Sequence, residues 1–199
     1  MDLVVGLQFK KREMGLIELL EKIRDYYLTR FKQEIDHQRS KGFGTIIEPE
    51  YLSESGEVIT EGFFDTPYRN DLFLVKEKKV TDSIMVDTAS KLSFDPIILR
   101  WTDSLVVNIE SFQWNFMTIK FEEINERFDW TPLKKWFMVS FESKTMGDDF
   151  CSVVHYISDP YPRNGKQMVD IDLGTGTIED LMTLFDALNE MSLTHVTIK

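Results

Sequence analysis

The sequence predicts an α+β fold, in which a long N-terminal helix and a C-terminal helix pack on a largely antiparallel sheet. A strand-helix-strand unit is expected at the C-terminus. This prediction rests on a long helical pattern that opens the chain, on short β-like runs in its middle, and on a strand, a glycine turn and a second helical pattern near its end. Neither an internal repeat nor a low-complexity linker interrupts residues 1–199, so we expect a single α+β domain.

The first 41 residues are predicted to contain a short strand and then the clearest helix of the chain. Residues 3–9 are apolar and are expected to form the strand, which the basic residues 10–12 end. The helix should end near Arg39, because Gly42 and Gly44 follow a basic last turn. From Met14 onward, apolar side chains recur at the three- and four-residue spacing of one helix face: Leu16, Leu19, Leu20, Ile23, Tyr27, Phe31 and Ile35.

The middle of the chain carries short apolar runs that indicate strands. Residues 45–47 and 57–60 are predicted to form a loose hairpin, and the charged residues 75–79 a solvated turn or edge. From Phe112, apolar and polar side chains alternate with the period of a half-buried strand. We therefore expect an antiparallel sheet of six or more strands, with β-like runs at 84–86, 97–101, 105–109 and 112–121.

A second hairpin is predicted after residues 131–135, which are typical of a short helical turn that has a proline at its start. Residues 136–141 and 150–157 are expected to be its two strands, joined across 146–149.

The C-terminal unit consists of a predicted strand at 168–173, a glycine turn, a helix and a final strand at 194–198. Thr177 and Asp180 have the spacing of a capping box, which marks the start of the helix. The two strands of such a unit are expected to be parallel. Because Glu179 stands where a dinucleotide-binding loop has its third glycine, the glycines are assigned to the turn and not to a cofactor site.

The chain is acidic, with a formal net charge of −11. The first 41 residues carry 9 Lys and Arg against 7 Asp and Glu, so the acidic excess lies in residues 42–199. An acidic protein repels phosphate backbones and attracts basic surfaces. We therefore expect a basic protein partner and no nucleic acid partner.

The lone Cys151 excludes an intramolecular disulfide and a zinc site built on paired cysteines. A single thiol is typical of the reducing cytosol. The N-terminus lacks the basic start and the long apolar run of a signal peptide, and no apolar run approaches the roughly 18 to 20 residues of a membrane span. These observations predict a cytoplasmic protein that does not enter a membrane.

No catalytic or cofactor-binding signature is present in the sequence. Cys151 and His155 are four residues apart on a predicted strand, about 13 Å along it, so they are too distant for a hydrogen bond. The three histidines are isolated, which argues against a metal site. We expect no catalytic residue, metal or cofactor, although an active site assembled from scattered Asp, Glu and Tyr residues leaves no linear motif.

The candidate partner-binding residues are four carboxylates and one tryptophan. Asp170 and Asp172 are two apart on a strand and share a face, which could receive Lys or Arg side chains of a partner. Asp148 and Asp149, in the predicted hairpin turn, could join them. Trp130 lies beside a turn and could anchor a partner, whereas the other tryptophans are expected to fill the core.

Together these features favour a non-catalytic acidic protein-binding module, and its most concrete form is an immunity-type inhibitor that neutralises a basic toxin or nuclease. The alternative is a small-molecule-binding protein or enzyme with an aromatic-lined pocket. The first class predicts exposed carboxylates and no deep pocket. The second predicts a concave aromatic cavity with converging polar groups.

Overall fold

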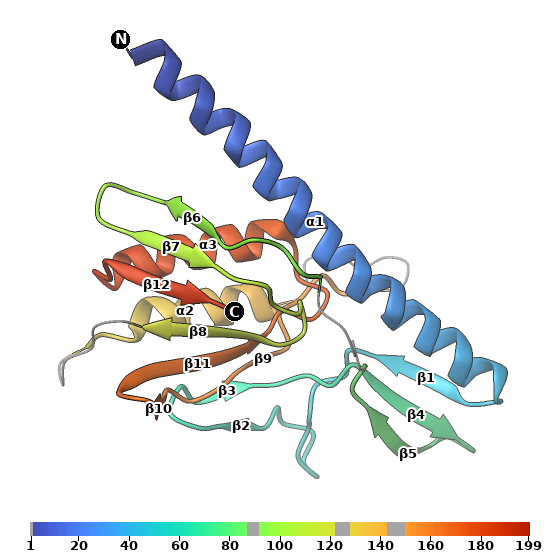
Figure 1. Ribbon diagram of the computed structural model, residues 1–199. Helices are drawn as coiled ribbons and strands as arrows, with labels where there is room; N and C mark the ends of the chain where they lie inside the picture. The colour runs from blue at the N-terminus through green and yellow to red at the C-terminus, as the bar shows by residue number, and fades with distance from the viewer. Residues whose placement is uncertain (1, 87–91, 122–127, 143–149) are drawn as a thin grey trace.

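The computed structural model describes residues 2–86, 92–121, 128–142 and 150–199, and it confirms an α+β fold (Figure 1). The helices in these residues are α1 (Asp2–Ser40), α2 (Thr131–Phe141) and α3 (Ile178–Glu190). The strands are β1 (Gly44–Ile47), β2 (Thr60–Glu61), β3 (Thr66–Pro67), β4 (Leu72–Lys76), β5 (Lys79–Ile84), β6 (Ile97–Arg100), β7 (Val106–Ile109), β8 (Met117–Phe121), β9 (Tyr156–Ile157), β10 (Tyr161–Arg163), β11 (Lys166–Asp172) and β12 (His195–Ile198).

Helix α1 begins at Asp2, so the strand predicted at residues 3–9 is wrong. A strand needs a neighbour for its backbone hydrogen bonds, whereas an established helix gains one such bond for each residue it adds. The predicted end is confirmed, because α1 stops at Ser40 and the Gly42 amide donates to the Arg39 carbonyl over 3.0 Å. Gly42 has a φ of +87°, the left-handed conformation that favours glycine after a helix.

The largest sheet has the strand order β10-β11-β8-β12-β7-β6, and β9 pairs with the end of β11. Its pairs are antiparallel except for β12 with β7. Since β11 and β12 both run antiparallel to β8, which lies between them, they are parallel to each other as predicted. Helices α2 and α3 lie side by side on one face of this sheet (Figure 1).

Helix α2 replaces the first strand of the second predicted hairpin, so that hairpin is wrong. Pro132 stands in its first turn, as expected, but the helix continues to Phe141. Of the second predicted strand, 150–157, only Tyr156–Ile157 is extended in β9, and the predicted turn 146–149 lies outside the described residues. The apolar run forms a helix because its buried side chains follow three- and four-residue spacings: Leu133, Trp136, Phe137, Ser140 and Phe141.

The smaller sheet has the order β1-β4-β5 and lies along the C-terminal half of α1 (Figure 1). Strand β1 pairs with β4, so the predicted pairing of residues 45–47 with 57–60 is wrong. The charged turn at 75–79 is confirmed, because Glu77 and Lys78 connect β4 to β5 with positive φ angles. Strands β2 and β3 form a separate two-stranded ribbon.

The predicted strand 112–121 is shorter in the structure, because β8 begins only at Met117. Phe112 and Trp114 precede it and are buried, but the alternation fails at Phe116, which is 59% exposed.

The core draws on both sheets and all three described helices. Helix α1 contributes the predicted apolar face, in which only Leu19 is half-buried. No helix in the described part of the chain combines the length and apolar character needed to cross a bilayer.

Candidate functional site

Two chain segments, residues 66–71 and 155–159, lie beside each other and form the candidate site. The Arg69 amide donates to the His155 carbonyl over 3.0 Å, which holds the segments together. Tyr68 and Tyr156 lie at the surface, whereas Asp71 and His155 are buried. The same two segments therefore carry a surface pocket on one side and a polar cluster on the other.

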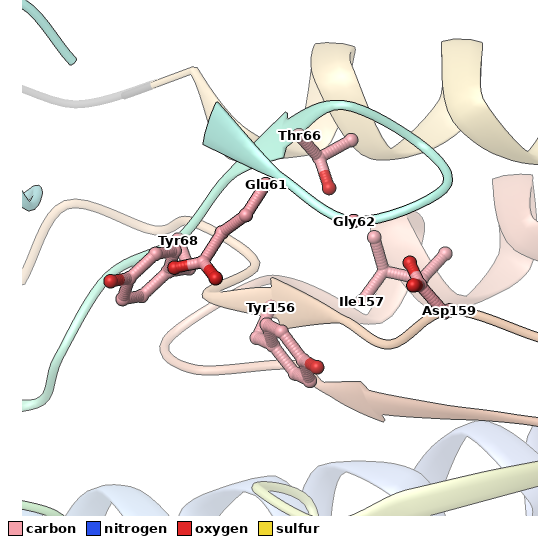
Figure 2. Close-up of a pocket in the computed structure, with 7 residues that line it drawn as sticks. All are labelled: Glu61, Gly62, Thr66, Tyr68, Tyr156, Ile157 and Asp159. Carbon is pink, nitrogen blue, oxygen red and sulfur yellow. The ribbon is translucent and has the colours of Figure 1, made fainter. Parts of the chain in front are cut away.

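The surface pocket has a volume of about 370 Å³ and is called the acidic pocket below. In Figure 2 the Glu61 carboxylate lies beside the Tyr68 ring, and the Asp159 carboxylate lies beside Gly62. Tyr156, on β9, also lines the pocket. No basic side chain is among the lining residues, which are Glu61, Gly62, Thr66, Tyr68, Tyr156, Ile157 and Asp159.

The electrostatics of the acidic pocket are negative. Partial burial raises the pKa of Tyr156, and the negative charges of Asp159, Asp170 and Glu61 raise it further. Burial also raises the pKa of Tyr68, together with its hydrogen bond to Glu61 and that carboxylate's charge. Each phenol stays protonated because ionisation would add an anion next to existing carboxylates.

Gly62 brings the β2-β3 loop against the second segment. It has a φ of +81°, and a Cβ at this position would lie 2.3 Å from Asp159 Oδ1. The Phe63 amide donates to that same oxygen over 2.5 Å. Only glycine permits this close approach, so Gly62 fixes Asp159 at the rim of the pocket.

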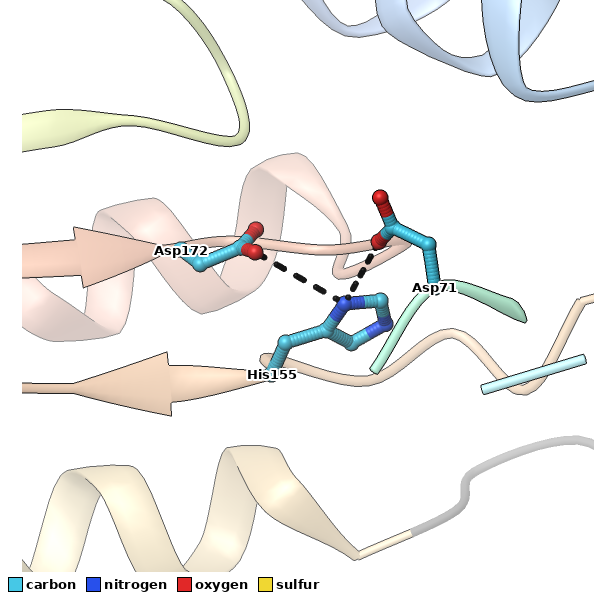
Figure 3. Close-up of side chains that lie close together, drawn as sticks. All are labelled: Asp71, His155 and Asp172. Carbon is cyan, nitrogen blue, oxygen red and sulfur yellow. Dashed lines mark ion pairs between the residues drawn. The ribbon is translucent and has the colours of Figure 1, made fainter. Parts of the chain in front are cut away.

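The buried cluster centres on His155, whose side chain is fully buried. Its Nε2 lies 2.7 Å from Glu48 Oε1. On the other side of the ring, Nδ1 lies 3.1 Å from Asp71 Oδ1 and 3.8 Å from Asp172 Oδ2, so two carboxylates approach one nitrogen (Figure 3). Nδ1 therefore forms an ion pair with Asp71 but makes no hydrogen bond.

Two opposing effects set the pKa values in the cluster: burial disfavours the charged form of each side chain, and the neighbouring groups of opposite charge favour it. Burial would lower the pKa of His155, but pairing with Asp71 and Glu48 and the charge of Asp172 outweigh it and raise that pKa to about 10. Burial raises the pKa of Asp172 to about 7, because the charge of His155 compensates only in part. Burial would raise the pKa of Glu48 as well, but its bonds to His155, Thr175 and Cys151 lower it.

The glycine turn after β11 closes over the imidazole. Gly174 has a φ of +51°, and a Cβ there would lie 2.2 Å from His155 Cδ2. Its amide donates to Asp172 Oδ1 over 2.8 Å. The turn predicted from the sequence therefore has a further role, because its first glycine makes room for the histidine. The predicted capping box of α3 is also present, with both Thr177–Asp180 hydrogen bonds formed.

The structure separates the residues predicted to bind a partner. Asp172 is only 7% exposed and faces His155, so it is not available at the surface and is omitted from the contact surface proposed below. Asp170 is half-buried and accepts hydrogen bonds from Thr118 and Tyr161, while its charge reaches the acidic pocket. Asp148 and Asp149 lie outside the described residues.

Trp130 is half-buried, and it packs edge-on against Phe63, Phe64, Phe121 and Phe128. Its contact Phe63 is exposed and follows Gly62, a lining residue of the acidic pocket, in the chain.

Sequence reasoning missed the cluster around His155. The sequence predicts that Cys151 and His155 are too distant for a direct hydrogen bond, but the Cys151 amide and His155 Nε2 both bind the carboxylate of Glu48. Glu48 and Asp71 come from segments distant in sequence, so no spacing could have linked them to His155. The one available signal was a histidine inside the otherwise apolar run 153–157.

Comparisons with protein families, with curated proteins and with solved structures found no match to this chain.

Proposed function

We propose that this protein is a non-catalytic, acidic protein-binding module whose acidic pocket receives a Lys or Arg side chain of a basic partner. The observation that carries the proposal is the pairing of two exposed carboxylates, Glu61 and Asp159, with the rings of Tyr68 and Tyr156. A cationic side chain forms strong hydrogen bonds with carboxylates and is attracted to aromatic faces.

An exposed apolar side chain, Phe63, follows the pocket residue Gly62 and supports a protein partner over a small ligand. The Phe63 side chain is 62% exposed, and its ring packs edge-on against Phe64 and Trp130, which hold it in place. Binding energy at protein interfaces concentrates in such rigid aromatic residues that lie next to charged contacts. Phe63 and the acidic pocket together form a mixed contact surface.

The net charge of −11 supports a fast encounter with a basic protein, because long-range attraction steers opposite charges together. Nucleases and other nucleic-acid-directed toxins carry basic sites that hold phosphates. We therefore propose an immunity-type inhibitor, which occupies the basic site of a toxin or nuclease and blocks its substrate.

A second groove, about 520 Å³ in volume, lies between α2 and α3 and is the weaker candidate. It is lined by Glu179, Asp186 and Glu190, but Lys135 also lines it. The lysine would repel a cationic side chain, whereas the lining of the acidic pocket contains no basic residue.

The proposal is tested by affinity capture from the source cell at low and high salt. Wild type is compared with the pocket variant Glu61→Gln/Asp159→Asn, which removes two negative charges and keeps side-chain size. Its control, Glu21→Gln/Glu190→Gln, removes the same charge from exposed positions outside the acidic pocket. We expect a basic protein to bind wild type and control at low salt, and to be lost at high salt and with the pocket variant.

The captured protein is then purified, and its toxic or nuclease activity is assayed with each variant. Inhibition by wild type and control, but not by the pocket variant, is the expected result. Equal capture by the pocket and control variants contradicts the proposal. A metabolite that co-purifies with wild type alone, without a basic protein, would support a small-molecule-binding function instead.

A further inference from the structure

A second site lies in the buried cluster, where Asp71, His155 and Asp172 each direct one ligand-type atom into the same space (Figure 3). All three atoms lie within 4.8 Å of one another, and the distances from His155 Nδ1 are 3.1 and 3.8 Å. Ligands bound at about 2.0 to 2.2 Å from one metal ion lie roughly 3.0 to 3.5 Å apart. The spacing of the cluster is close to that of a coordination sphere.

His155 Nδ1 is an independent sign of a missing ligand. It is buried and faces two carboxylates, and although it forms an ion pair with Asp71 at 3.1 Å, it makes no hydrogen bond to either of them. Buried polar atoms are rarely left unpaired, and an unpaired one calls for an explanation such as a bound ion.

The opposite side of the ring is arranged as it is in metal-binding histidines. Nε2 lies 2.7 Å from Glu48 Oε1 and can donate its proton to that carboxylate. An ion that binds Nδ1 displaces the proton of that nitrogen. A metal-bound histidine usually donates its other ring N–H to a carboxylate, which fixes the tautomer and the orientation of the ring. Thr175 and the Cys151 amide hold Glu48 in this position.

The two aspartates are also held by groups outside the cluster. The Tyr27 hydroxyl donates to Asp71 over 2.8 Å, and the Val86 amide donates to its other oxygen over 2.5 Å. The Gly174 amide donates to Asp172. Carboxylates that are oriented before the ion arrives lose less conformational freedom when they bind it.

We propose that Asp71, His155 Nδ1 and Asp172 bind one divalent transition-metal ion, with Zn²⁺ as the expected occupant and Mn²⁺ as the next. Imidazole together with carboxylates suits these ions, whereas Mg²⁺ and Ca²⁺ prefer oxygen ligands alone. The ion would offset the charges of carboxylates that face each other in the core.

Full burial makes this a structural site, which an ion enters as the chain folds. It would join the segment that leads into β4, the segment that leads into β9, and the end of β11. The inference does not depend on the proposed function, because the pocket could bind a partner with or without the ion.

The test is the metal content of the full chain, purified from cells supplied with Zn²⁺ and Mn²⁺ and measured by elemental mass spectrometry. About one ion per chain is expected. Refolding from denaturant after chelation should then give a melting temperature about 5 to 10 °C higher with Zn²⁺ at a hundredfold excess over its Kd, and no such rise with Mg²⁺.

The ligand variant is Asp172→Asn, which keeps the acceptor for Gly174 and removes the charge. Its control is Asp180→Asn, at a buried carboxylate in the capping box of α3. We expect Asp172→Asn to weaken Zn²⁺ binding at least tenfold and the control to retain it. Equal metal content in both variants, or a metal-free wild type whose melting temperature does not respond to Zn²⁺ or Mn²⁺, overturns the inference.

If Asp172→Asn does not fold, nuclear magnetic resonance of the wild-type imidazole decides the question. Zn²⁺ on Nδ1 excludes a proton there. A protonated Nδ1 in the presence of saturating Zn²⁺ and Mn²⁺ would contradict the site.

Discussion

The acidic pocket and the buried cluster share two chain segments, residues 66–71 and 155–159, yet they place the same type of side chain in opposite environments. Asp159 and Glu61 are exposed, whereas Asp71 and Asp172 are inside the protein. In water a carboxylate remains charged at little cost and is available to a partner. In the interior it must be paired, so its charge serves the fold. Burial, and not residue type, decides which carboxylates can act at the surface.

The largest expected effect comes from removing a buried partner of His155. Glu48→Ala leaves Nε2, the Cys151 amide and the Thr175 hydroxyl without their acceptor. We expect the free energy of unfolding to fall by about 3 to 5 kcal/mol, measured by urea denaturation. Glu21→Ala, at an exposed position of α1, should change it by no more than about 0.5 kcal/mol. If both variants lost a similarly small free energy of unfolding, the buried carboxylates would contribute no more to stability than the exposed ones, which would contradict the comparison.

A smaller effect is expected from adding one methyl group beside the imidazole. Gly174→Ala combines left-handed backbone strain with a contact of 2.2 Å to His155 Cδ2, so it should destabilise the fold by about 2 to 5 kcal/mol. Gly165→Ala is the matched control, because its φ is +74° but nothing lies within 4 Å of the added Cβ. It should cost only about 1 to 2 kcal/mol.

Thermal and urea unfolding of the two glycine variants measure this difference. Equal losses would mean that the turn does not pack against the histidine.

The smallest effect on stability is expected at the acidic pocket. Glu61→Gln/Asp159→Asn should leave the free energy of unfolding within about 1 kcal/mol of wild type, because both carboxylates are exposed. The pKa of Tyr156 should fall toward its ordinary value, since two of the three charges that raise it are removed. The part of the shift caused by burial, the larger cause, should remain.

The pKa of Tyr156 is measured from the chemical shift of its phenolic carbon as the pH is raised. Glu21→Gln/Glu190→Gln should leave that pKa unchanged. A pocket variant with the wild-type pKa would contradict a negative field at Tyr156.

Local sequence patterns correctly predicted those features of the fold that are determined by residues close to one another in the sequence. The capping box at Thr177 and Asp180, the end of α1 and the parallel strands of the C-terminal unit all follow from short-range signals. Residues 136–141 form a helix and not the predicted strand, because their buried side chains continue the helical spacing that begins at Leu133.

The site could not be predicted in the same way, because long-range packing creates it. The alternation of polar and apolar side chains along the strand correctly placed Asp170 on the face opposite to its apolar neighbours. The same pattern could not show that His155 and Asp71 would bury Asp172. Glu61 and Asp159 line the same pocket because Gly62 permits close contact between two distant segments. Such contacts leave no periodic signal in either segment.

The central claim is that the acidic pocket, and not the acidic surface in general, receives a basic side chain. It is tested most directly by a nuclear magnetic resonance titration of the wild-type protein with a short peptide rich in Lys and Arg. The account predicts amide shifts centred on Glu61, Gly62, Tyr156 and Asp159, which weaken with added salt and are absent from the pocket variant. Shifts centred on the groove between α2 and α3, or spread evenly over the exposed carboxylates, would contradict it.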